Sequence, residues 1–594
     1  MNRMQEDYGT LLSLNPLAEF DIPPVDPGDA LAPFDRAQES LSGPWHFTPD
    51  PYNTCLRKRF FEEKAEDAEG RPTPVDYDLD AWPTVQVPGC WNCADARYAL
   101  YEGAAVYARA FDYAAQRPGE RVFLRIGAAN YACRAFLNGR LLARHEGGFT
   151  PFCVELTDTL RSHNRLILQV DNARDARQVP SLNYDWFNYG GLTREVSLLR
   201  VPARFIQDAF LSLSPDSDER IDVRVRLSGA RGGERVEVAL PELDARVTLA
   251  VSPDGTACGQ LSARPSLWSP DAPVLYDAVV ACEGDCVRDR VGFRRIETRG
   301  RRILLNGEEI FLRGVCCHEE APGKGRTLRE EDARQAILDA KALGCNAMRL
   351  THYPHSEQMA RLADELGMLL WEEIPVYWAI DFSDPQTEAC ARRQLEELIL
   401  RDRGRASVIL WSVGNENPDT QERFDFMSGL VRLCRRLDPT RLTTAACLVN
   451  VDEMRVCDRL ADVVDVVAFN EYYGWYYRDY APLSEILQRT RTEKPLVISE
   501  TGAGARAGLH GGDEELFTEE HQAKVYEKQL EIADGRLQGF FSWILYDFRS
   551  PIRLNAQQEG FNRKGLIADD RKARKLAFDV VRRYYRSKTT GAKG

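Results

Sequence analysis

The stretch Leu410-Trp-Ser-Val-Gly-Asn-Glu-Asn417 is an apolar run that ends in a glutamate, and Leu496-Val-Ile-Ser-Glu-Thr-Gly502 repeats this design. Apolar runs of this length, bounded by polar residues, are typical of parallel strands that are buried on both faces. Each strand would carry one carboxyl group, that of Glu416 or Glu500, to its carboxyl end. That end is where barrel proteins build their functional sites.

Eight apolar runs follow Gly292, and helical patterns alternate with them. The predicted strands are Phe311–Cys317, Ala347–Tyr353, Met368–Ile374, Val408–Glu416, Thr443–Leu448, Val466–Tyr472, Leu496–Glu500 and Gly539–Asp547. The predicted helices are Glu330–Leu343, Ser356–Leu366, Gln386–Asp402, Glu422–Leu437, Thr518–Ile532 and Ala573–Tyr585. Because strands that alternate with helices form parallel sheets, this pattern predicts a closed (β/α)8 barrel, a TIM barrel, over residues 298–594.

The chain before the barrel reads as two all-β domains. Short alternating segments run from Pro44 to Leu199, and the turn Asn138-Gly139 is a strong hairpin signal. Further strands continue to Val291, separated by loop markers such as Pro253-Asp254-Gly255. We therefore expect β-sandwich domains over residues 1–201 and 202–297.

The composition allows ordinary cores and excludes two classes of partner. Of the residues, 44% are hydrophobic, and 77 Lys and Arg against 91 Asp and Glu give a net charge of −14 without a basic tract. We therefore expect no nucleic-acid partner and no anionic-membrane partner. The first 25 residues have neither a basic start nor an unbroken apolar stretch, so we expect no signal peptide, no membrane helix and a cytoplasmic location.

The 15 cysteines lack the spacing of a metal or disulfide framework. Cys90 and Cys93 form a single CxxC, Cys316 and Cys317 are adjacent, and no second CxxC or Cys/His cluster accompanies them. We therefore expect reduced thiols, no metal site and no cofactor.

Glu416 would end the fourth strand of the barrel and Glu500 the seventh. Strands three apart in a ring of eight lie on facing sides of the mouth, so the two carboxyl groups can face each other across a substrate. Hydrolysis of a glycosidic bond uses such a pair, one protonated to release the leaving oxygen and one ionised to meet the developing cation. Because Glu372, Glu373 and Glu471 also end strands, the sequence leaves open that either glutamate is a solvated loop acid or an ion-pair partner.

Short motifs surround both glutamates and others occur along the chain. They are Trp411-Ser-Val-Gly-Asn-Glu-Asn-Pro418, Ser499-Glu-Thr-Gly502, Val87-Pro-Gly-Cys-Trp91, Phe136-Leu-Asn-Gly139, Gly147-Gly-Phe-Thr-Pro151 and Phe311-Leu-Arg-Gly-Val315. The set resembles glycoside hydrolase family 2, in particular its β-glucuronidase branch. The resemblance implies a jelly-roll-like sugar-binding sandwich, an immunoglobulin-like sandwich and a catalytic barrel.

The same resemblance implies a mechanism. Glu500 would be the nucleophile and Glu416 the acid/base of an exo-acting enzyme that retains the β-configuration. For this double displacement the two carboxyl groups should stand about 5–5.5 Å apart.

Asn562-Arg563-Lys564-Gly565, in the loop expected after the eighth strand, resembles the Asn-x-Lys motif with which β-glucuronidases bind a sugar carboxylate. An ammonium and an amide suit a carboxylate, whereas a neutral hexose would leave Lys564 without a charge partner. We therefore expect Asn562 and Lys564 to bind a uronate. Without the family context, the same four residues would be an ordinary polar turn.

The resemblance also implies further residues around the sugar. The expected substrate-binding residues are Asp185, His352, Asn415, Asn470, Tyr472, Tyr476 and Trp543, and the expected supporting residues are Arg349 and Trp475. Tyr472 would donate to the nucleophile, and Arg349 would keep it ionised. Asp185 remains open as a surface-loop acid, and His352 as a structural histidine.

The chain departs from the family pattern before the Asn-x-Lys motif. β-Glucuronidases often carry an arginine shortly before it, but Ala556-Gln-Gln-Glu-Gly560 stands there and Arg553 is farther away. Since glucuronate and galacturonate differ only at C4, a β-galacturonidase is the nearest alternative. A β-galactosidase is the next, and an inactive carbohydrate-binding protein is a remote one.

The connection from Ile374 to Gln386 is short and leaves little material for a lid over the mouth. We therefore expect an open aglycone side. The expected partners are a small-molecule glycoside or oligosaccharide and further copies of the chain in a homo-oligomer.

Overall fold

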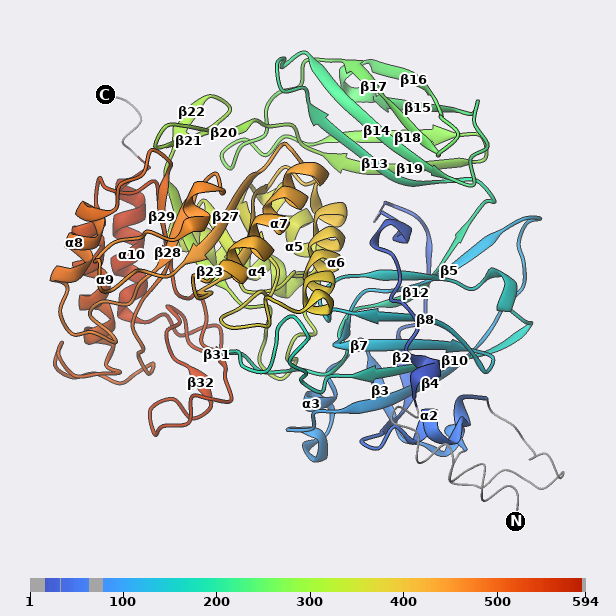
Figure 1. Cartoon of the computed structure of the whole chain (residues 1–594), viewed down its shortest axis with the longest axis horizontal. Helices are drawn as coiled ribbons and strands as arrows, with labels where there is room; N and C mark the ends of the chain where they lie inside the picture. Colours follow the sequence, from blue (N-terminus) through green and yellow to red (C-terminus); the bar gives the residue numbers. More distant parts are fainter. Residues whose placement is uncertain (1–16, 33, 63–77, 590–594) are drawn as a thin grey trace.

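The computed structural model describes residues 17–32, 34–62 and 78–589, which form two β-sandwiches and a barrel (Figure 1). The first sandwich packs a four-stranded sheet on a six-stranded one. The four-stranded sheet has the order β1 (Gln38–Ser40), β12 (Val196–Val201), β5 (Arg121–Ile126) and β9 (Phe152–Glu155). The six-stranded sheet has the order β3 (Thr84–Val87), β2 (Gly43–Pro49), β4 (Ala104–Asp112), β10 (His163–Asp171), β7 (Ala132–Leu137) and β8 (Arg140–Glu146).

The predicted hairpin joins β7 to β8. Asn138 and Gly139 both have positive φ, 51° and 82°, which is the backbone that a tight two-residue hairpin turn requires. A loop from Asn172 to Gly190 leaves this sandwich after β10 and returns at β11 (Gly191–Leu192). In Figure 1 the teal part of this sandwich extends toward the barrel.

The second sandwich packs a three-stranded sheet on a four-stranded one. The three-stranded sheet has the order β13 (Phe205–Leu213), β14 (Arg220–Ser228) and β17 (Thr256–Ser262). The four-stranded sheet has the order β16 (Ala245–Ala250), β15 (Arg235–Leu240), β18 (Tyr276–Cys282) and β19 (Asp285–Val291). Along β14, Ile221, Val223, Val225 and Leu227 alternate into the core, as the period of two predicts. The expected domain boundaries at 201/202 and 297/298 stay predictions.

The barrel confirms the predicted eight parallel strands in a closed ring. In order they are β23 (Leu312–Cys317), β24 (Ala347–Leu350), β25 (Leu369–Glu373), β26 (Val408–Asn415), β27 (Leu442–Cys447), β28 (Val467–Asn470), β29 (Leu496–Thr501) and β30 (Gly539–Ser542). Every residue of β26 and β29 is buried, which explains their unbroken apolar character. A small sheet of β20 (Ile296–Arg299), β21 (Arg302–Leu305) and β22 (Glu308–Ile310) precedes the ring.

The outer helices match the predicted ones closely. They are α4 (Glu330–Leu343), α5 (Glu357–Leu366), α6 (Pro385–Asp402), α7 (Gln421–Leu437), α9 (Glu519–Ala533) and α10 (Leu576–Ser587). A further helix, α8 (Ala481–Arg489), was not predicted, because its apolar positions Leu483, Ile486 and Leu487 span little more than one turn. None of the helices in the described ranges has the length and apolar character needed to cross a lipid bilayer.

Candidate active site

The two predicted carboxylates meet at the carboxyl end of the barrel. Glu500 belongs to β29, the seventh strand, and Glu416 directly follows β26, the fourth. Both line one cavity of about 280 Å³. Glu416 has a positive φ of 52°, and its backbone N–H donates to Ala446 O of the next strand at 2.9 Å, which fixes where the side chain leaves the ring.

Three groups surround the Glu500 carboxylate. Arg349 Nη1 donates to its Oε1 at 2.8 Å, the Tyr472 hydroxyl donates to its Oε2 at 2.8 Å, and His352 Nε2 lies 3.7 Å from Oε1. Burial raises the pKa of Glu500, while Arg349, His352 and Tyr472 oppose the rise. These contacts favour the ionised carboxylate that a nucleophile must be.

Arg349 is fully buried and is shared by two carboxylates. Besides Glu500, its guanidinium donates to Glu373 at 3.0 and 3.1 Å, and Nη2 donates to Asn415 Oδ1 at 2.7 Å. Burial works to raise the pKa of Glu373, but Arg349 and His352 outweigh it and the pKa is lowered. Glu373 thus anchors the arginine from the side opposite the nucleophile.

The Glu416 carboxylate is held by two donors. Trp378 Nε1 donates to Oε2 at 2.8 Å and Asn470 Nδ2 donates to Oε1 at 3.1 Å. Trp378 itself has a positive φ of 53°, and its backbone N–H donates to Asn415 O at 2.9 Å. Sequence reasoning missed Trp378, because nothing in the loop after β25 signals that this tryptophan turns back over the barrel.

Asn415 and Asn470 connect the two glutamates. Asn470 Nδ2 donates to Asn415 Oδ1 at 3.1 Å, and the Ser499 hydroxyl donates to Asn470 Oδ1 at 2.7 Å. Asn415 and His352 are buried and are not among the residues that line the cavity. In this structure they contact protein groups, so their substrate-binding roles stay predictions.

Lys564 lies on the far side of the same cavity. Its side chain is buried, with the residue 3% exposed, and Nζ donates to the Tyr476 hydroxyl at 2.9 Å. The ammonium also lies 4.9 to 5.6 Å from the ring centres of Tyr472, Trp475 and Tyr476. Among the residues that the structure describes, no carboxylate forms an ion pair with Lys564.

Arg553 enters the site as well, although it is eleven residues before Lys564 in the chain. The short strands β31 (Phe548–Arg549) and β32 (Phe561–Asn562) pair and fold the intervening loop back on itself. Arg553 Nη1 thereby comes within 3.4 Å of the Tyr476 hydroxyl. Its separation from the Asn-x-Lys motif in the sequence had indicated that Arg553 lies away from the site. The hairpin of β31 and β32 is the physical reason that Arg553 reaches it.

Asp185 reaches this corner from the loop of the first sandwich. It forms an ion pair with Arg553, accepts from Asn562 Nδ2 at 3.2 Å and accepts from the Ser550 hydroxyl. The interpretation of Asp185 as a solvated surface acid is therefore wrong, since the residue is buried. Its two oxygens hold Arg553 and Asn562 in place.

Aromatic residues complete the pocket. Trp543 lines the cavity and stacks on His352 at 5.1 Å between ring centres. Trp475 lies behind Lys564, packed edge-on against Phe517 at 5.1 Å. The predicted residues thus come together from both sides of the barrel mouth.

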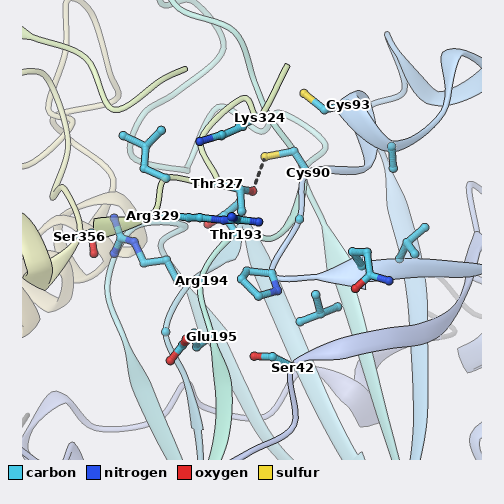
Figure 2. Close-up of a pocket in the computed structure, with 18 of the residues that line it drawn as sticks. Ser42, Cys90, Cys93, Thr193, Arg194, Glu195, Lys324, Thr327, Arg329 and Ser356 are labelled. Carbon is cyan, nitrogen blue, oxygen red and sulfur yellow. Dashed lines mark hydrogen bonds between the residues drawn. The ribbon is translucent and has the colours of Figure 1, made fainter. Parts of the chain in front are cut away.

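A larger cavity, of about 960 Å³, lies between the first sandwich and the barrel (Figure 2). None of the predicted site residues lines it. Its lining mixes cations such as Lys324 and Arg329 with acids such as Glu195, and Cys90 Sγ lies 3.4 Å from Thr327 Oγ1. The described residues include no cluster of three or more His, Cys, Asp or Glu side chains that could hold a metal.

Known proteins share this architecture. The family models that match are the sugar binding domain of glycosyl hydrolases family 2, over residues 38–202, and the TIM barrel domain of the same family, over residues 296–589. A β-glucuronidase from Paenibacillus borealis is 28% identical over 592 residues, which cover 88% of this chain and 94% of that protein. A β-glucuronidase from Rattus norvegicus is also 28% identical, and the match covers 93% of this chain and 91% of that protein.

Solved structures agree in fold. A β-glucuronidase from Bifidobacterium dentium, complexed with coumarin-3-O-glucuronide, superposes with a TM-score of 0.83 at 25% identity, covering 93% of this chain and 97% of that one. A β-galacturonidase from Eisenbergiella tayi, bound to galacturonate, superposes with a TM-score of 0.80 at 26% identity. The match covers 94% of this chain and 99% of that one. Since the two family models together span most of the chain, this protein belongs to glycoside hydrolase family 2 and is a glycosidase.

Proposed function

We propose that this glycosidase is a retaining, exo-acting β-glucuronidase. The observation that carries the proposal is the buried ammonium of Lys564, which faces the same cavity as Glu416 and Glu500 and forms no ion pair with any described carboxylate. A buried charge without a partner is unfavourable, and a carboxylate on the substrate would supply the partner. Arg553 and Asn562 beside it would add donors to the same carboxylate.

In the proposed reaction Glu500 attacks the anomeric carbon while Glu416 protonates the leaving oxygen. The bond between sugar and aglycone breaks and a glycosyl ester with Glu500 forms. Glu416, now ionised, then takes a proton from water, the water oxygen attacks the same carbon, and Glu500 is released. Tyr472 and Arg349 would stabilise the carboxylate of Glu500 before attack and after release.

Relatives support a uronide substrate. The similar proteins named above are β-glucuronidases, and one structural neighbour is a β-galacturonidase bound to galacturonate. The latter is the reason to keep β-galacturonidase as a second candidate. A β-galactosidase would leave Lys564 without a counter-ion, so it is less well supported.

The test compares nitrophenyl β-glucuronide, β-galacturonide and β-galactoside as substrates of wild type, Glu500→Gln and Lys564→Ala. Glu500→Gln should abolish all activity. Lys564→Ala should lower kcat/KM on the preferred uronide by about 10- to 100-fold, the worth of a hydrogen bond to a charged group, and leave the galactoside rate nearly unchanged. An equal loss on both would sink the uronate assignment.

The stereochemistry has its own test. Proton NMR of the first-formed sugar should show the β-anomer, because two displacements restore the configuration. Release of the α-anomer first would contradict the nucleophile role of Glu500.

We further infer a cytoplasmic protein that forms a homo-oligomer. All 15 cysteines are free thiols, which supports a reducing compartment. Cell fractionation and light scattering after size exclusion test the two points.

A further inference from the structure

We propose that the buried ion pair of Lys575 and Asp547 positions the group that would bind the substrate carboxylate. The pair contacts the backbone of residues 563–565, which we call the binding segment, and neither of its residues lines the cavity. It would thereby fix where the Lys564 ammonium stands relative to Glu500. The inference rests on the proposed function, because it takes Lys564 to bind a uronate.

The three residues of the Asn-x-Lys motif do not all face the cavity. Asn562 and Lys564 line it, whereas Arg563 between them does not. The Arg563 guanidinium instead forms ion pairs with Asp569 and Asp547. An extended chain sends successive side chains to opposite sides, and the short strand β32 leads directly into the segment. The middle residue of the motif therefore ties the segment to the protein rather than to the substrate.

Lys575 uses all three of its ammonium hydrogens to hold this part of the chain. It directly precedes α10 and is 1% exposed. Its Nζ donates to Arg563 O at 3.0 Å, to Asp547 Oδ1 at 2.7 Å and to Ala505 O at 2.7 Å. Ala505 lies in the loop after β29, and its backbone N–H donates to Arg563 O at 2.8 Å. One ammonium thus joins the binding segment to the strand that carries the proposed nucleophile.

Asp547 and Gln522 hold the other end of the binding segment. Asp547 Oδ1 accepts from the backbone N–H of Gly565 at 2.8 Å, and Gln522 Nε2 donates to Gly565 O at 3.2 Å. The approach is so close that a Cβ on Gly565 would lie 2.2 Å from the backbone nitrogen of Asp547. Any side chain there would push the segment away, which explains the glycine that follows Lys564. The backbone is therefore fixed on both sides of the lysine.

Stability alone does not account for the pair. Both side chains are fully buried, and burial lowers the pKa of Lys575 although Asp547 opposes the fall. Desolvation of two charges can cost more free energy than their attraction returns, so well-packed apolar residues are often at least as stable. What a buried pair adds is a defined geometry, because its donors must meet acceptors at set positions. Here the geometry defined is that of the binding segment.

The placement matters because a sugar must reach two groups at once. Its carboxylate would contact Lys564 while its anomeric carbon meets Glu500, and a displacement of about 1 Å can cost about a hundredfold in rate. Lysine has a long, flexible side chain, so its charge is well placed only where both ends are held. Tyr476 contacts the tip, and the pair would fix the base. Lys575 and Asp547 are thus positioning residues, which act through Lys564.

The experiment is a double-mutant cycle in the full chain, with Lys575→Met, Lys564→Ala and both together. The substrates are the nitrophenyl glycoside of the preferred uronate and its uncharged counterpart, which has a hydroxymethyl group in place of the carboxylate. Asp547→Asn/Lys575→Met removes both charges and replaces Lys575→Met if the single variant fails to fold, since it leaves no unpaired carboxylate. Arg36→Met is the matched control, because it breaks a largely buried pair with Asp285 of the second sandwich.

Lys575→Met should lower kcat/KM on the uronide by about tenfold, and on the uncharged counterpart by less than about twofold. In the Lys564→Ala background it should change uronide kcat/KM by less than about twofold, because the group that it positions is gone. Arg36→Met should alter neither value. The same loss with and without Lys564, equal losses on both substrates, or no loss would each overturn the proposal. Failure of both charge variants to fold would also overturn it, in favour of a purely structural pair.

Failure of the proposed function would look different. If Lys564→Ala left the preference for the uronide over its uncharged counterpart unchanged, the uronate assignment would fall and the positioning role with it. If Lys564→Ala lowered that preference and Lys575→Met did not, the assignment would stand and only the positioning role would be wrong.

Discussion

At the scale of single residues, the chemistry depends on how two glutamates of similar position acquire different surroundings. Glu500 contacts a cation and a phenol hydroxyl, whereas Glu416 contacts an indole N–H and an amide. The sequence predicted both glutamates because each ends a local apolar run. It did not predict Trp378, whose contact depends on a backbone turn.

The acid limb of the pH profile should reflect Glu500. Burial raises its pKa above the ordinary value, so the ionised nucleophile is lost at a higher pH than for a solvated glutamate. Tyr472→Phe removes a donor to the ionised form and should shift the acid limb of kcat/KM further toward higher pH. Glu500 would not control this limb if the profile of the variant overlaid that of wild type.

Trp378→Phe should weaken the acid/base step. The variant keeps an aromatic ring but loses the hydrogen bond to Glu416, worth about 1 kcal/mol or a five- to tenfold change in rate. The loss should appear in kcat on a methyl glycoside, which needs a protonated leaving group, and little on a nitrophenyl glycoside. Equal losses on both would show that the tryptophan acts on binding rather than on Glu416.

At the scale of elements, the hairpin of β31 and β32 decides which residues reach the sugar. The Asn-x-Lys motif and its place after the eighth strand predicted Asn562 and Lys564, through the resemblance to the family. They could not give Arg553, since the loop between the two short strands folds back by long-range pairing. Helix α8 escaped prediction for a different reason, its shortness.

Asp185→Asn tests the anchor of that hairpin. The change removes the negative partner of Arg553 while keeping the shape of the side chain. Loss of one partner of a largely buried ion pair leaves a poorly compensated charge, so the melting temperature should fall and uronide kcat/KM should drop by about tenfold or more. Arg121→Gln, which breaks an exposed pair with Glu155, is the control and should change neither. An unchanged variant would show that Arg553 needs no anchor.

At the scale of the whole molecule, the three-part architecture and the barrel were predictable because they repeat simple periodic patterns. The contacts between parts were not, since Asp185 and Arg553 belong to segments 368 residues apart. Such pairings leave no periodic signal in the chain. The resemblance to a family implied that Asp185 enters the pocket, but not which residue would hold it.

The stability of the whole protein should depend on Glu471. Burial raises its pKa to about 7, whereas its ordinary value is 4.5. The unfolded chain therefore loses this proton first, and stability present below pH 4.5 is lost as the pH rises toward 7. Glu471→Gln should stabilise the protein by up to about 3 kcal/mol above pH 7 relative to its effect at low pH. Urea unfolding at both ends of this range measures it, and a difference that is independent of pH would contradict the assignment.

The ion pair between Asp185 and Arg553 has a consequence for how the protein matures. Asp185 is synthesised early and Arg553 near the end, so the corner that would grip the uronate forms only after the first sandwich has docked on a finished barrel. Selectivity for the acidic sugar would then be a reporter of correct assembly. As the denaturant concentration rises, the selectivity for uronides should be lost at a lower concentration than the hydrolysis of activated substrates by Glu416 and Glu500.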